Sequence, residues 1–325
     1  MKKRVLSGIR ATGRLHLGNY LGAVKGMLEL QNSEEYETYY MVADVHTITT
    51  PYSVEDLRKN RREVILDYLA VGLDPEKSVI FQQSEIPEHL ELSFYLSSVV
   101  TVAKMQHLPT FKDKVKQYPQ NATMALLNYP ILMSADILIY KGELVPVGID
   151  QEPHLEVARE IARRFNQDYG TDLAEPQRFK TQGEYVPSLT GEGKMSKSIE
   201  GSYINLTDNL EEITAKVAKI PTDSGKGESI EGGVKSLFEL VGLFQGKEEK
   251  DEYETLYKNG GVRYGDIKAS LSEAIFNELR PIQEKRAEFE GDPDLVDRII
   301  SEGNEEARRV AKRTMEEVRK KMGLL

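Results

Sequence analysis

The chain of 325 residues contains no cysteine and no tryptophan, and it has no long apolar run. Without cysteine it cannot form disulfides, thiolate zinc sites, iron–sulfur clusters or a cysteine nucleophile. The lack of disulfides fits a reducing compartment. No apolar stretch approaches the roughly 18 residues of a membrane span, and the basic start is not followed by the apolar segment of a signal peptide. We therefore expect a cytoplasmic protein that does not act at a membrane.

An excess of positive charge is missing as well, because the formal net charge is −10. This acidic balance argues against a protein that coats nucleic acid or binds DNA by bulk charge. Basic groups at residues 112–116 and 308–321 remain, and each by itself is most simply a solvated helix face. The length and the 39% hydrophobic content fit a globular protein of about two domains.

Several common catalytic motifs are also absent. Lys194 is followed by Met195, so there is no Walker-type phosphate loop, and no GxGxxG follows an expected strand. The five histidines lack metal-ligand spacing, so no resident metal is expected. No serine lies in a GxSxG elbow.

Two segments carry a phosphate-binding pattern. Residues 7–22 combine a glycine-containing loop with a helix start at His16-Leu17-Gly18-Asn19. Unpaired first-turn N–H groups and the helix dipole would favour an anion there. Residues 194–198, Lys-Met-Ser-Lys-Ser, place two ammonium groups in a glycine-flanked loop that could close. A cap or a solvated loop is the plainer interpretation of each segment alone, but together they predict a phosphate site.

Strand and helix patterns alternate through the first half of the chain. Strands are expected at residues 5–6, 36–45, 79–81 and 144–147, with helices between them and a helix over 121–140 interrupted at Pro130. Beyond residue 207 the pattern is nearly all helical. This order predicts an α/β protein: a doubly wound, Rossmann-like parallel sheet with a smaller all-helical domain.

Four segments in the same order resemble the bacterial type of tryptophanyl-tRNA synthetase, a family of class I aminoacyl-tRNA synthetases. They are SGIRATGRLHLGNYLGA, YPILMSADILIY, VPVGIDQEPHLEVAREIARRFN and GKMSKS. The resemblance implies that tryptophan and ATP give tryptophanyl-adenylate and pyrophosphate, and that tryptophan then passes to the 3′ end of its tRNA. Because the substrate carboxylate is itself the nucleophile, the protein would supply positioning and charge, with Mg²⁺ on the phosphates.

The resemblance also implies roles for individual residues. The catalytic contacts would come from His16, Asn19, Lys114, Lys194 and Lys197. ATP would also contact Arg10, Ala11, Thr12, Gly18, Gly148, Ile149, Asp150, Val186, Met195, Ser196 and Ser198. Tryptophan would contact Asp136, Tyr129, Met133, Gln151, His46 and Leu6, with Tyr129 and Gln151 near its ammonium group.

Asp136 is the residue expected to select the amino acid. It lies between Ala135 and Ile137 in an apolar segment, and a buried carboxylate needs a partner. An ordinary helix carboxylate is the plainer interpretation, whereas the resemblance implies that Asp136 accepts the indole N–H of tryptophan. A site built around that hydrogen bond could reject phenylalanine by roughly 10⁴–10⁵-fold.

Three residues depart from the family pattern. Arg10 stands where glutamine is frequent, Leu6 where phenylalanine is frequent, and Ile149 where the turn commonly has an acidic residue. Two other functions stay open: a tyrosyl-type ligase of the same class, and a non-catalytic relative that binds tRNA or a protein. The GIDQ turn and the Asp136 segment count against the first, and the two loop lysines against the second.

The resemblance implies a domain order and partners. Residues 1–190 would form the catalytic domain, 191–206 the mobile KMSKS loop and 207–288 a helical domain that recognises the anticodon. Residues 289–325 would form C-terminal helices that could pack back on the catalytic domain. The partners would be the tryptophan tRNA, L-tryptophan and a second copy of the chain, but neither a membrane nor DNA.

Overall fold

Five parallel strands form one sheet in the computed structural model, in the order β3-β2-β1-β4-β5. The structure describes residues 2–181, 185–197, 199–227 and 229–325. The strands are β1 (Lys3–Arg10), β2 (Tyr36–Ala43), β3 (Ser78–Gln82), β4 (Leu144–Pro146) and β5 (Gln177–Phe179). From β1 the chain builds the sheet to one side through β3 and then returns to the other side at β4. The doubly wound parallel sheet is confirmed.

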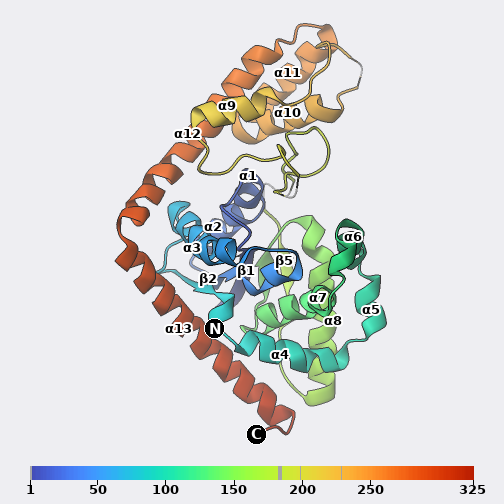
Figure 1. The fold of residues 1–325 in the computed structure, drawn as a ribbon, viewed down its shortest axis with the longest axis vertical. Coiled ribbons are helices and arrows are strands. Elements are labelled where there is room, and N and C mark those ends of the chain that lie inside the picture. The colour runs from blue at the N-terminus through green and yellow to red at the C-terminus, as the bar shows by residue number, and fades with distance from the viewer. Residues whose placement is uncertain (1, 182–184, 198, 228) are drawn as a thin grey trace. The chain divides into compact units, whose positions relative to one another are not determined.

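Helices follow most of the strands and make up the rest of the fold (Figure 1). They are α1 (Leu17–Asn19), α2 (Lys25–Asn32), α3 (Val54–Ala70), α4 (Glu88–Leu96), α5 (Val102–His107), α6 (Pro109–Gln117), α7 (Met124–Leu138), α8 (Glu152–Tyr169), α9 (Leu210–Ala218), α10 (Gly232–Phe244), α11 (Lys247–Asn259), α12 (Tyr264–Gly291) and α13 (Pro293–Lys321). Tight turns include the π-helical η1 (Tyr20–Val24) and the 3₁₀ turns η2 (Val45–Thr49), η3 (Gln83–Glu85) and η6 (Ile149–Gln151). None of the helices in the described part of the chain has the length and apolar character needed to cross a membrane.

The chain divides into two compact units. The sheet unit comprises Met1–Gly13, Gly26–Lys180 and Phe289–Leu325, and the helical unit comprises Arg14–Lys25 and Thr181–Glu288. The C-terminal residues therefore belong to the sheet unit. The helix start with His16 belongs to the helical unit, although it follows directly on β1 in the sequence.

Side chains of β2 alternate between the two faces of the sheet, as a strand requires. On one face the Tyr40 hydroxyl donates to the carbonyl of Met27 in α2 at 2.6 Å. On the other face Tyr39 stacks on Tyr140, with ring centroids 4.9 Å apart. Helices therefore bury both faces of the sheet, which is the usual situation of a parallel sheet.

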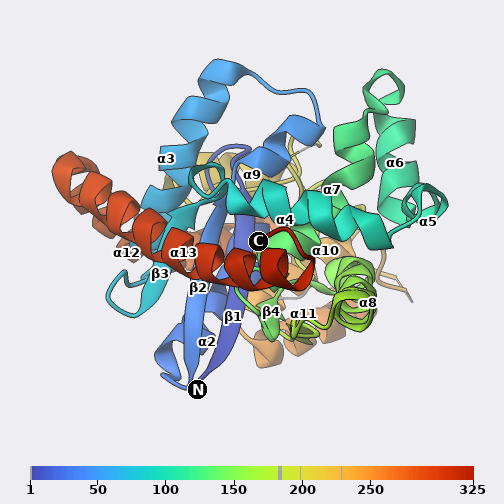
Figure 2. The same cartoon turned by 90° about the horizontal axis from the view of Figure 1, so that it is seen from below.

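Helix α13 covers the edge of the sheet at β3, as Figure 2 shows. A Cβ on Gly303 would lie 1.8 Å from the carbonyl oxygen of Ile80, so only glycine permits this approach. The next residue, Asn304, accepts the N–H of Gln82 through its Oδ1 at 2.9 Å. The helix thereby satisfies a strand edge that would otherwise be open to association.

The structure differs from the sequence-based expectation in three elements. Helix α7 continues through Pro130, whose carbonyl accepts the Ser134 hydroxyl at 2.8 Å. Strand β5 and helix α11 were not expected. β5 is only three residues long and pairs with β4 alone, and α11 is mostly charged, with Tyr257 as its one buried residue.

Candidate active site

Asp136, in α7, is buried in the sheet unit and accepts hydrogen bonds from three side chains. Its Oδ1 lies 2.8 Å from Gln83 Nε2 and 2.6 Å from His89 Nδ1, and its Oδ2 lies 2.8 Å from His46 Nε2. Burial raises the pKa of Asp136, but the hydrogen bonds from His46 and His89 outweigh it and hold the pKa at about 2. Asp136 is therefore an ionised acceptor at neutral pH, at a depth where an unpaired charge would be very costly.

Two of the donors come from turns at the carboxyl ends of neighbouring strands, and the third, His89, comes from α4. His46 lies in η2 after β2, and Gln83 begins η3 after β3. Gln83 Oε1 accepts the N–H groups of Val45 at 3.1 Å and of His46 at 3.3 Å. Because these N–H groups fix the oxygen of the amide, its NH₂ group has to face Asp136.

Tyr129 is also held by a histidine. Its hydroxyl lies 2.6 Å from His154 Nε2, which is also 3.1 Å from Thr110 Oγ1. The Tyr129 ring meets the His46 ring edge-on, with centroids 6.4 Å apart. Tyr129 therefore lies beside the Asp136 network, and its contact with tryptophan stays a prediction.

The other residues predicted to contact tryptophan differ in burial. Met133 is half-buried on α7, three residues before Asp136, and so lies on the same helix face. Leu6 is fully buried in the core at β1. Gln151 donates from Nε2 to the carboxylate of Asp150 at 2.9 Å.

Arg10 is the last residue of β1, and only part of its guanidinium group is hydrogen-bonded. Its Nη2 donates to Thr50 Oγ1 at 2.9 Å, while its buried Nε meets no acceptor among the described residues. Burial lowers the pKa of Lys114, and the charge of Arg10 lowers it further, so the two cations lie near each other. Two neighbouring cations favour an anion.

The other residues of the sheet unit that are predicted to contact ATP follow neighbouring strands. Ala11 and Thr12 come directly after β1. Gly148, Ile149 and Asp150 come after β4, which pairs with β1, and Ile149 is 60% exposed. The strand order reverses between β1 and β4, and in open α/β sheets that point is where ligands bind.

In the helical unit His16 caps α1. Its Nδ1 accepts the Gly18 N–H at 3.0 Å, and its own N–H donates to Asn19 Oδ1 at 3.3 Å. A Cβ on Gly18 would come within 2.8 Å of the His16 ring, so the glycine is required for this cap.

The expectation of unpaired first-turn N–H groups is wrong. The N–H of Leu17 donates to Ile204, that of Gly18 to the His16 ring, and those of Asn19 and Tyr20 to the His16 carbonyl. Residues 204–206 pair with residues 15–17 like a short antiparallel strand, and this pairing includes the Leu17 N–H that was expected to be free. Any phosphate contact here therefore has to come from side chains.

The His16 ring is neutral. Burial and, to a smaller extent, the charges of Lys197 and Lys194 together lower its pKa to about 3. Because Nδ1 accepts from Gly18, the proton of the neutral ring is on Nε2. His16 therefore keeps an N–H donor at every physiological pH.

Within the helical unit, Met195 lies beside Gly18, since a Cβ on Gly18 would lie 3.4 Å from the Met195 Cβ. The Met195 N–H donates to the Val186 carbonyl at 2.9 Å, and both side chains are buried. Ser202, fully buried, accepts the Ser196 N–H at 3.1 Å and donates back to the Ser196 carbonyl. The loop that carries Lys194 and Lys197 is thus anchored at its centre. Ser198, also predicted to contact ATP, lies outside the described residues.

The family profile described as tRNA synthetases class I (W and Y) matches residues 1–280. The chain belongs to this family. It is 41% identical over 329 residues to the tryptophan–tRNA ligase of Porphyromonas gingivalis, with 98% of each chain covered. The tryptophanyl-tRNA synthetase of Mycoplasma pneumoniae has a TM-score of 0.87 at 30% identity, with 100% of this chain and 99% of that chain covered. The Campylobacter jejuni enzyme, complexed with ADP and tryptophan, has a TM-score of 0.83 at 31% identity, with 99% of this chain and 100% of that chain covered.

Four residues of the hydrogen-bond networks around Asp136 and Tyr129 were not predicted from the sequence as site residues. They are Gln83, His89, Tyr140 and His154. Two signals could have pointed to some of them. Gln83 follows directly on a parallel strand, where side chains converge with those of the next strand. His89 and His154 each lie near the start of a helix.

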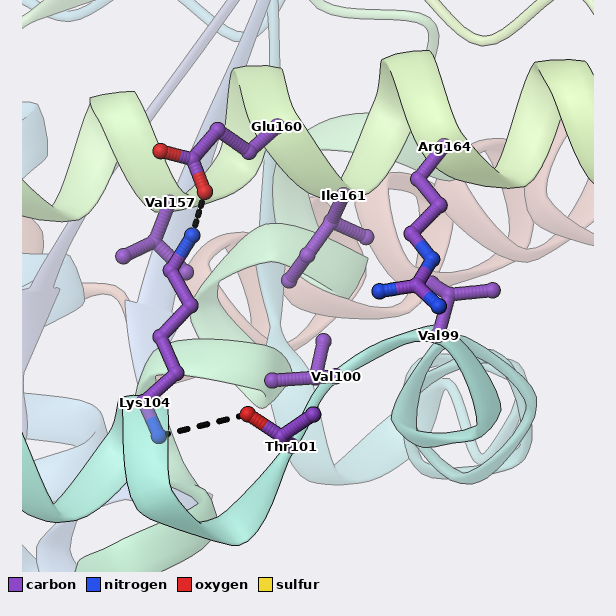
Figure 3. A pocket seen from close by; sticks show the side chains of 8 residues that line it. All are labelled: Val99, Val100, Thr101, Lys104, Val157, Glu160, Ile161 and Arg164. Carbon is purple, nitrogen blue, oxygen red and sulfur yellow. Dashed lines mark hydrogen bonds and ion pairs between the residues drawn. The ribbon is translucent and has the colours of Figure 1, made fainter.

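Elsewhere in the sheet unit the surface has a small pocket between α5 and α8 (Figure 3). Val99, Val100, Val157 and Ile161 give it an aliphatic wall, and Lys104 pairs with Glu160 at its side. None of the predicted site residues lines this pocket.

Proposed function

We propose that the chain charges tRNA with tryptophan in two steps, forming tryptophanyl-adenylate from L-tryptophan and ATP and then transferring tryptophan to the tRNA 3′ end. The observation that carries this proposal is Asp136, an ionised carboxylate buried beside aromatic side chains. Tryptophan carries one polar group on its ring, and an acceptor of this kind matches it. Membership in the synthetase family and the 41% identity to a tryptophan–tRNA ligase support the proposal.

In adenylate formation the carboxylate of tryptophan attacks the α-phosphorus, and pyrophosphate leaves. The chain needs no nucleophile of its own for this step, so its contribution is to position the reactants and stabilise charge. From the family pattern we assign Arg10, Lys114, Lys194 and Lys197 to the phosphates of ATP. Neutral His16 donates from Nε2 without adding charge.

Mg²⁺ is proposed as the metal that accompanies ATP. No group of three or more acidic or histidine side chains suited to a metal occurs in the parts of the chain that the structure describes. This fits Mg²⁺, which commonly keeps several waters and is held through substrate phosphates. Bound there, it would neutralise phosphate charge.

Amino-acid-dependent ATP–pyrophosphate exchange tests the reaction across all amino acids. Exchange with tryptophan alone is the expected result. Exchange with tyrosine instead would establish the tyrosyl-type alternative, and no exchange with any amino acid would favour a non-catalytic relative. Because the chain contains no tryptophan, indole emission reports binding of the ligand directly.

A second copy of the chain is the proposed protein partner. On α4 Leu90 is 51% exposed and Phe94 75% exposed, four residues apart on one helix face, and Val102 at the start of α5 is 59% exposed. Clustered exposed apolar side chains commonly mark an interface. Phe94→Glu should convert a dimer into a monomer in sedimentation, whereas Leu324→Glu, at the exposed C-terminus, should not. A monomeric parent chain would contradict the proposal.

The remaining assignments concern location and tRNA. We propose a cytoplasmic enzyme, supported by the lack of cysteine.

The helices within residues 207–288 are proposed to recognise the anticodon of the tryptophan tRNA. A chimeric tRNA with an exchanged anticodon, tested as a substrate, would check this assignment.

A further inference from the structure

The acceptor capacity of Asp136 is almost fully used within the protein. An ionised carboxylate offers about four lone-pair positions. Gln83 and His89 occupy two on Oδ1, and His46 occupies one on Oδ2. Among the described residues no further donor reaches this group, so Oδ2 keeps one acceptor position.

The orientation of the His89 ring is fixed by burial and by a second hydrogen bond. It is fully buried in α4, and its Nε2 lies 2.8 Å from the Tyr140 hydroxyl. Burial raises the pKa of Tyr140 well above its ordinary value, so the hydroxyl keeps its proton and can donate to Nε2. Nδ1 then carries the ring proton and donates to Asp136 Oδ1.

Gln83 is held from its other end. The backbone N–H groups of Val45 and His46 fix its oxygen, so its NH₂ group cannot turn away from Asp136 without leaving them unpaired. Both donors to Oδ1 are therefore held in place by other groups of the protein.

Resting on the proposed function, we propose that Gln83 and His89 are positioning residues for tryptophan recognition. By saturating Oδ1 of Asp136 they leave Oδ2 as the acceptor for the indole N–H. Neither residue has to touch the substrate. Their effect is selectivity for an amino acid whose ring carries an N–H, rather than general affinity for aromatic amino acids.

The decisive comparison uses tryptophan and its benzothienyl analogue, in which sulfur replaces the indole N–H. We expect the kcat/KM advantage of tryptophan over the analogue to fall by about tenfold or more in His89→Leu and in Gln83→Met. His89→Asn, whose amide can donate from the position of Nδ1, should recover most of it. A merely structural defect would weaken both substrates alike and leave their ratio unchanged.

The pH dependence of tryptophan binding gives a second readout. The titratable groups facing Asp136 are His46, His89 and Tyr140, with Glu88 near Tyr140. In the parent chain Asp136 stays ionised across about pH 5–8. When His89 is removed, one of the hydrogen bonds that oppose the effect of burial is lost, so the pKa of Asp136 rises. The tryptophan affinity of the variant should therefore fall as the pH is lowered, and by more than that of the parent chain.

The outcomes separate the two proposals. A parent chain without tryptophan-dependent exchange overturns the proposed function itself. A parent chain that selects tryptophan, with an unchanged ratio in His89→Leu and Gln83→Met, overturns only the positioning roles. If His89→Leu does not fold, the ratio in Gln83→Met decides.

Discussion

The sheet unit and the helical unit hold their polar site residues in different ways. Around Asp136, partners from three separate elements converge, and the central groups are buried. Around His16 the partners are neighbours in the chain or lie in one loop, and the lysines stay partly exposed. A network of distant, buried partners suits selection of one substrate, because any mismatch leaves a polar group unsatisfied. A locally anchored cationic loop suits charge stabilisation during a reaction.

The largest expected effect separates recognition from chemistry. Asp136→Ala removes the proposed indole acceptor. It also leaves Gln83, His46 and His89 without the carboxylate that accepts their hydrogen bonds. We expect tryptophan affinity, measured by indole emission, to fall by at least about 100-fold. Asp136→Asn keeps the shape and should fold better while still losing most affinity. Normal affinity in both variants would contradict the assigned role.

The next effect belongs to the helical unit. Lys194→Ala and Lys197→Ala should slow adenylate formation, measured in single turnover, by about 10²–10³-fold each. Tryptophan affinity should change little, because these charges act on the transition state. Lys219→Ala, in the same unit but outside the loop, serves as the control. Equal losses in affinity and rate would show that the lysines act on binding instead.

A smaller effect distinguishes the cap from the catalytic donor. His16→Ala removes both, whereas His16→Asn keeps a good capping side chain and removes the imidazole. We expect His16→Ala to lower the free energy of unfolding by about 1 kcal/mol, and His16→Asn to leave it nearly unchanged. Adenylate formation should be slower in both. A fully active His16→Asn would restrict His16 to capping.

The same contrast explains what sequence could predict. The doubly wound sheet followed from alternating strands and helices, and the burial of Asp136 followed from its apolar neighbours. Sequence signals could mark Gln83 and His89 as candidates, but their contact with Asp136 could not be predicted, because it depends on how β3, α4 and α7 pack. The expectation of unpaired N–H groups after His16 failed partly for a similar reason, since the Leu17 N–H donates to Ile204 from far along the chain. The N–H groups of Gly18, Asn19 and Tyr20 are paired locally with His16.

The smallest effect tests how the loop lysines act on His16. Its pKa is lowered to about 3 chiefly by burial, and then by Lys197 and Lys194. Replacing both lysines by glutamine should therefore raise the pKa of His16, measured by NMR of the ring, yet leave it below the ordinary value of 6.5. Lys112→Gln, in the sheet unit, should not move it.

The sign of the effect on stability follows from linkage. A histidine whose pKa is lower in the native state disfavours folding once the unfolded chain takes up a proton, so stability falls as the pH drops below 6.5 towards 3. The double lysine variant should lose less stability over this range than the parent. An identical loss in both chains would mean that burial alone keeps His16 neutral, and that the lysines act only on the substrate.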